Sequence, residues 1–135
     1  MKRFLIIGTI VFSACQSNDT LPANQVSVRL HQSARLSSDI IVRVDSIWDG
    51  RCPNSTSFSC LTAGSVTVKL LLSKSVDSSA VRLTLGYYDK NNRLDSTKVT
   101  LSSQAYKVVL KDVTPYPTSF MPDPTQKAIV EVARL

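Results

Sequence analysis

The chain has 135 residues, 43% of them hydrophobic and 19% charged, and its formal net charge is +6. This length is enough for one domain with its own core and too short for two, and the composition is that of an ordinary globular protein. The basic residues are scattered along the chain and no nucleic-acid-binding motif accompanies them. We therefore expect no nucleic-acid partner.

The N-terminal segment MKRFLIIGTIVFSAC has the layout of a secretory signal peptide. Lys2 and Arg3 precede an apolar run over residues 4–12, and small residues lead to Cys15. The run falls far short of the roughly 20 apolar residues that a membrane-spanning helix needs. Cleavage of residues 1–14 removes two basic residues and lowers the formal net charge from +6 to +4.

The four residues FSAC, 12–15, resemble the lipobox of bacterial lipoproteins, although Phe12 stands where an aliphatic residue is usual. The resemblance implies that Cys15 is acylated, with palmitate-type chains, and becomes the new N-terminus. Two or more acyl chains give stable membrane attachment. An ordinary signal peptide, cut elsewhere and leaving Cys15 free, is the alternative. The polar residues 15–24 are expected to form a lipidated tether.

The rest of the chain, residues 25–135, is expected to be one β-sandwich domain. Alternating apolar residues with many β-branched side chains predict half-buried strands. The alternation predicts seven strands, at 25–30, 39–47, 65–72, 81–88, 96–101, 105–113 and 127–135. Seven short strands without an amphipathic helix indicate an all-β, antiparallel sandwich of immunoglobulin-like architecture. The polar segment around residues 89–92 is expected to be the tip of a hairpin.

Two cysteines, Cys52 and Cys60, lie between the second and third predicted strands. Disulfides are the default in exported compartments, so with Cys15 assigned to the lipid we expect these two to be bonded. A zinc site needs two further Cys or His ligands, and the chain offers His31 alone. A redox dithiol prefers the Cys-x-x-Cys spacing at the start of a helix. We expect no metal and no cofactor.

The segment VDSIWDGRCPNSTSFSCLTAGSVTVKLLL resembles a group of small, uncharacterised bacterial lipoproteins that share an Asp-Ser-Arg-Cys-Pro run, a second cysteine and Trp-Ala-Gly before a strand. The matching residues are Asp49, Arg51, Cys52, Pro53, Cys60, Ala63, Gly64 and the strand from Val66. YKVVLKDVTPYP and AIVEVARL resemble the group's last two strands. Gly50 and Thr62 depart from the marker, and Trp48 is the nearest tryptophan. The resemblance implies the disulfide, the sandwich and the lipid anchor, and no established activity.

Residues suited to catalysis are scarce. His31 is the only histidine, and no Gly-x-Ser-x-Gly elbow is present. Paired carboxylates for glycoside chemistry would have to come from the few Asp residues and Glu131. The sequence therefore predicts a protein that is not an enzyme.

Two segments are candidate binding surfaces. Trp48, with Asp49 and Arg51 close behind it, could stack on a sugar, or could simply cover the edge of the core. Residues 114–125 contain four prolines together with Tyr116 and Phe120. Such long, stiff links often carry function, but they can equally cap the open end of a sandwich.

These features together predict a lipoprotein of the Gram-negative cell envelope, held at the outer membrane by the lipid on Cys15. The expected role is that of a non-enzymatic binding or structural module, with an envelope protein or a glycan as partner. An inhibitor or a carbohydrate-binding module is the alternative function.

Overall fold

The computed structural model describes residues 22–54, 59–86 and 94–135. Cys15, the expected signal peptide and the tip at 89–92 lie outside these residues. No helix within the described ranges is long and apolar enough to cross a membrane. The ranges contain eight β-strands: β1 (Gln25–Arg29), β2 (Ser33–Arg35), β3 (Ile41–Asp49), β4 (Val66–Lys74), β5 (Asp77–Leu85), β6 (Ser96–Leu101), β7 (Gln104–Thr114) and β8 (Lys127–Arg134).

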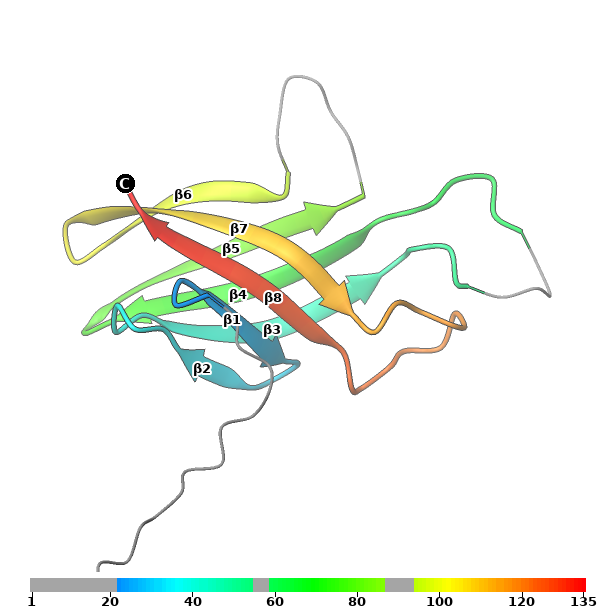
Figure 1. The fold of residues 1–135 in the computed structure, drawn as a ribbon, viewed down its shortest axis with the longest axis horizontal. Helices are drawn as coiled ribbons and strands as arrows, with labels where there is room; N and C mark the ends of the chain where they lie inside the picture. Colours follow the sequence, from blue (N-terminus) through cyan, green and yellow to red (C-terminus); the bar gives the residue numbers. More distant parts are fainter. Residues whose placement is uncertain (1–21, 55–58, 87–93) are drawn as a thin grey trace, which may run out of the picture.

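The strands form two four-stranded sheets that pack face to face (Figure 1). One sheet has the order β1-β8-β7-β6 and the other the order β2-β3-β4-β5, and every paired strand is antiparallel to its neighbour. The predicted all-β antiparallel sandwich is confirmed. In the second sheet, strands that are neighbours in the chain are also neighbours in space. An immunoglobulin constant domain differs in this respect, because its sheets have the strand orders ABED and CFG.

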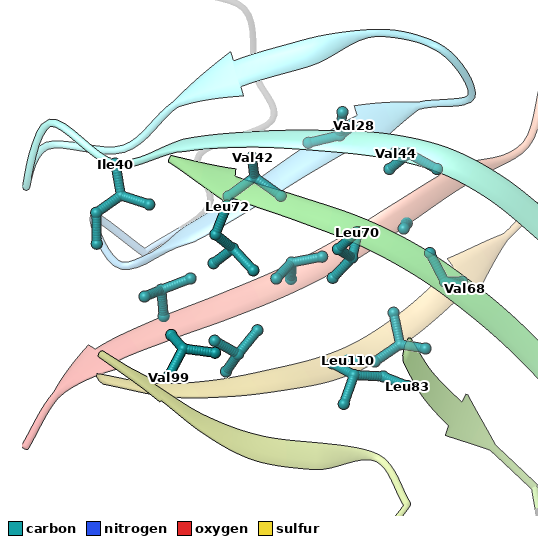
Figure 2. Close-up of a cluster of buried hydrophobic side chains, with 14 of the residues drawn as sticks. Val28, Ile40, Val42, Val44, Val68, Leu70, Leu72, Leu83, Val99 and Leu110 are labelled. Atoms are coloured by element: carbon teal, nitrogen blue, oxygen red, sulfur yellow. The ribbon is translucent and has the colours of Figure 1, made fainter. Parts of the chain in front are cut away.

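The core lies between the sheets and follows the alternation of the strands. In β4, Val66, Val68, Leu70 and Leu72 are completely buried, while the residues between them face outward. Figure 2 shows side chains from both sheets meeting in this layer, among them Val42 and Val44 of β3, Val99 of β6 and Leu110 of β7. Each such side chain contributes about 1.5–3 kcal/mol when it is fully buried.

Two tight turns define the pairing of neighbouring strands. Ser102 and Ser103 join β6 to β7 with φ values of 49° and 65°, as expected for the two central residues of a type I′ hairpin turn. Ser75, at φ 53°, and Val76 join β4 to β5. The fifth strand therefore begins at Asp77, four residues before the predicted start at residue 81.

Two further details of the sequence prediction differ from the structure. Ser33–Arg35 is an eighth strand, which pairs with residues 41–43 of β3 and is too short to show an alternation. The expected hairpin around residues 89–92 is wrong, because β5 and β6 belong to different sheets.

The two ends of the sandwich differ. At one end, here called the loop end, β3 and β7 finish and lead into the two long connections, which start at residues 50 and 115 (Figure 1). The first described residues reach the other end, where Asn24 O accepts a 2.9 Å hydrogen bond from Val132 N near the C-terminus. The five residues of β1, about 16 Å at 3.3 Å per residue, separate this chain entry from the loop end.

Candidate functional site

Cys52 and Cys60 form a disulfide in the connection that follows β3, with an S–S distance of 2.04 Å and a Cα–Cα distance of 5.9 Å. The predicted pairing is confirmed, and these thiols do not serve as zinc ligands. Two backbone bonds close the base of the connection: Gly50 N donates to Ser65 O at 2.8 Å, and Cys52 N donates to Ala63 O at 2.7 Å. The described residues contain no group of three or more His, Cys, Asp or Glu side chains placed for a metal.

Glycine is required at position 64 in this base. Gly64 has a φ of +73°, in the left-handed region that side chains disfavour. A Cβ at this position would overlap the carbonyl oxygen of Gly50. The close approach of the two backbone segments brings the end of β3 against the start of β4.

Asp49, the last residue of β3, forms an ion pair with Arg51. The Asp49 Oδ1 atom accepts bonds from Arg51 Nε at 2.9 Å and from Arg51 N at 3.1 Å, while a guanidinium nitrogen lies 2.7 Å from Oδ2. Gln126 Nε2 also donates to Oδ2. The two charged side chains are only 10% and 11% exposed, so this sequence-predicted pair is an internal element of the loop end.

The environment keeps Asp49 ionised. Burial opposes its charge and by itself raises the pKa, but the hydrogen bonds from the Arg51 side chain and backbone and from Gln126, with the charge of Arg51, outweigh burial. The pKa of Asp49 therefore lies below the usual 3.8. The hydrogen bond to Asp49 likewise raises the pKa of Arg51, against an opposing effect of burial. The pair is fixed as carboxylate and guanidinium at neutral pH.

Arg51 joins the two long connections. Its guanidinium carbon lies 4.6 Å from the centroid of the Tyr116 ring, a cation–π contact. Asn54 N donates a 2.9 Å hydrogen bond to Pro117 O nearby. The Thr114–Pro115 peptide bond before Tyr116 is cis. The structure thus brings together two candidate surfaces that lie about sixty residues apart in the chain.

Beside this junction lies a cavity of about 560 Å³, within the usual size range of small-molecule sites. Trp48, Ile47 and Leu30 line it from the strands, and residues 117–124 line it from the other side. Trp48 is 53% exposed and Phe120 is 75% exposed. Of the five residues predicted for a binding surface, Trp48 and Phe120 lie at the cavity with large exposed areas, and Tyr116 is exposed beside it.

The carboxylates at the cavity are engaged in internal bonds. Asp49 and Asp123 both line it. Asp123 Oδ1 accepts hydrogen bonds from Thr125 N at 2.8 Å and from Thr125 Oγ1 at 2.6 Å, and these bonds lower its pKa. The two acidic residues are thus held charged, in positions that support the loop.

The histidine and the Asp residue nearest before Asp49 do not line the cavity. His31 is exposed between β1 and β2, and Asp45 forms a 2.6 Å ion pair with Arg43. Gln126, which is only 6% exposed, was missed by the sequence reasoning. A single polar residue before an alternating strand carries no signal of such a role.

Comparisons of the chain with protein-family models, with curated proteins and with solved structures give no match.

Proposed function

We propose that this protein is a lipid-anchored binding module of the bacterial cell envelope, without catalytic activity, and that its ligand site is the cavity at the loop end. The cavity itself carries the proposal. Its exposed lining is aromatic and proline-rich, as in sites that bind by burying surface. Its carboxylates are committed to Arg51, Gln126 and Thr125, which leaves binding as the role that the lining supports best.

The anchor rests on the N-terminal sequence, in which a signal-like segment is followed by Cys15. The fold supports such an arrangement in one respect. The described chain enters at the end of the sandwich opposite the cavity. A domain tethered through residues 15–24 would therefore present the cavity away from the bilayer surface, where an envelope partner can reach it.

The anchor is tested by mass spectrometry of the mature protein and by membrane fractionation. An acylated N-terminal Cys15, and release of a Cys15→Ala variant from the membrane fraction, are the expected results. A mature chain that keeps residues 1–14, or an unmodified Cys15, would refute the lipid anchor.

Binding is tested by affinity capture from detergent-solubilised membranes with the wild-type protein and with Phe120→Ala and Lys107→Ala variants. Phe120 lines the cavity, whereas Lys107 does not; it is an exposed residue of β7 in the β1-β8-β7-β6 sheet. A partner retained by wild type and by Lys107→Ala, but lost with Phe120→Ala, supports the cavity. Equal capture by all three proteins, or capture by none, contradicts it.

A further inference from the structure

We infer that the outer face of the β2-β3-β4-β5 sheet, where it borders the cavity, binds an acidic saccharide, meaning a sugar chain that bears carboxylate or phosphate groups. The inference deepens the proposed function, on which it rests, by naming a class of ligand. It is carried by Trp48, Lys69 and Arg82, which three neighbouring strands place together.

Strand register puts these side chains on one surface. Lys69 of β4 lies opposite Arg82 of β5, and Trp48 of β3 lies opposite Thr67. Within β4, Val66, Val68 and Leu70 are buried in the core. Thr67 and Lys69 alternate with them along the strand and therefore face outward. The outward side chains at this corner are thus one indole, two cations and the hydroxyls of Thr67 and Thr84.

The two cations on this surface lie opposite each other, and no described residue forms an ion pair with either of them. Lys69 and Arg82 are directly opposite like charges, which destabilise a strand pair. The neighbouring carboxylate, Asp45, is bonded to Arg43 at 2.6 Å; this bond is the main cause that lowers the pKa of Asp45, and the charge of Lys69 contributes less. An external anion would relieve the repulsion, so the pair favours a negatively charged ligand.

The aromatic residue indicates which kind of anion. The guanidinium carbon of Arg82 lies 5.0 Å from the centroid of the Trp48 ring. A carboxylate or phosphate bound to Arg82, which suits such groups through paired hydrogen bonds, would therefore hold its sugar ring beside the indole. Thr67 Oγ1 and Thr84 Oγ1, 2.9 Å apart, each keep hydrogen-bonding capacity for sugar hydroxyls.

The same protein contains a matched control. Lys98 of β6 and Lys107 of β7 are also directly opposite like charges on an outer face, and the residue next to them on β8 is Ala133. This second pair has the same charge and no aromatic neighbour at the paired positions. Simple attraction of polyanions would use both pairs, whereas the proposed site requires Trp48.

The test is calorimetric titration of the mature protein in detergent with polygalacturonate, with a phosphorylated mannan and with neutral dextran. We expect binding of at least one acidic polymer and none of dextran. Arg82→Gln and Trp48→Ala should each weaken that binding tenfold or more, and Lys98→Gln less than twofold. Thermal melting checks that the variants are folded, which exposed positions such as Arg82 should permit.

Three results would overturn the inference: no binding of either acidic polymer, equal loss in Lys98→Gln and Arg82→Gln, or equal binding of polyglutamate or DNA. The two proposals can fail separately. If an envelope partner is captured in a way that depends on Phe120 and not on Arg82, and no saccharide binds, the proposed function stands and the saccharide inference is refuted. If a saccharide binds in a way that depends on Arg82 and Trp48, and no partner depends on Phe120, the saccharide inference stands and the cavity is refuted as the partner site.

Discussion

Gln126 Nε2 donates a 2.5 Å hydrogen bond to Asp49 Oδ2, which links the residue before β8 to the last residue of β3 across 77 positions of the chain. The two strands lie in different sheets. The bond therefore fastens the sheets to each other at the loop end, directly at the cavity. The stability of this end depends on a buried polar network as well as on apolar packing.

Loss of this network should destabilise the fold. Gln126→Leu removes one donor to the carboxylate, and we expect it to lower the free energy of unfolding by about 1–3 kcal/mol. Asp49→Ala should cost more, about 3 kcal/mol, because it leaves the largely buried Arg51 without its partner. Urea denaturation measures both. Asp45→Ala, which breaks a more exposed ion pair, is the control and should have a smaller effect.

The same carboxylate should make the protein sensitive to acid. The pKa of Asp49 is lower in the folded state than the usual 3.8, so the unfolded chain binds the proton more tightly. The resulting stability is fully present above pH 3.8 and is lost as the pH falls through the folded-state pKa. We expect a steeper fall in the free energy of unfolding below pH 4 for wild type than for Asp49→Asn. Identical pH profiles would contradict the assignment.

Opening the disulfide should destabilise the domain without unfolding it. Cys52 and Cys60 are eight positions apart, and closing so short a loop contributes about 2.6 kcal/mol in the chain-entropy model. The Cys52→Ser/Cys60→Ser double variant should therefore unfold at lower urea concentration. Addition of a reducing agent should shift wild type toward the variant and leave the variant unchanged. A reductant effect on the variant would mean that another thiol is responsible.

Two neighbouring glycines should tolerate alanine very differently. Gly64→Ala combines a positive φ with overlap against Gly50 O, and we expect a loss of about 3 kcal/mol. A Cβ on Gly50 would lie 3.2 Å from Ser65 O, a tight contact that a small shift relieves. Gly50→Ala should therefore cost about 1 kcal/mol or less. Thermal or urea denaturation decides, and equal losses would be inconsistent with the close approach.

Ser46 should be a position where a substitution stabilises the protein. Its Oγ is buried and has no hydrogen-bond partner among the described residues, and an unmet hydroxyl costs about 1–3 kcal/mol. Ser46→Ala is expected to raise the free energy of unfolding by about 1 kcal/mol. Ser27→Ala, at an exposed position of β1, should stay within about 0.5 kcal/mol of wild type. A destabilised Ser46→Ala would reveal a partner for the hydroxyl.

Alternation of apolar side chains was sufficient to predict the sandwich. Seven segments could be located from the sequence because each turns two or more apolar residues of one face toward the core, fully or partly buried. Ser33–Arg35 could not, since only Ala34 of its three residues is turned inward. The early start of β5 was hidden because Asp77 to Ser79 are polar residues paired with the end of β4. The change of sheet after β5 depends on long-range packing that local turn residues do not encode.

The candidate site was predicted in two separate parts. Trp48 and Phe120 were each singled out as aromatics in irregular surroundings, but nothing in the sequence indicates that one cavity joins them. The join comes from the pairing of β7 with β8, which folds the 115–126 connection back over the end of β3. Asp49 and Arg51 belong to the binding surface expected from the sequence; in the structure they are bonded to each other and largely buried, and Asp49 also lines the cavity.

The pairing of β1 with β8 has a consequence for the order of folding. β1 begins at Gln25 and β8 ends at Arg134, so the first strand completes its ladder with the last one. The β2–β5 meander, in contrast, pairs segments that follow one another closely in the chain. During synthesis, the β2–β5 sheet can form while the C-terminus is still absent. The N-terminal strand must wait for the final ten residues before it gains its hydrogen-bonded neighbour.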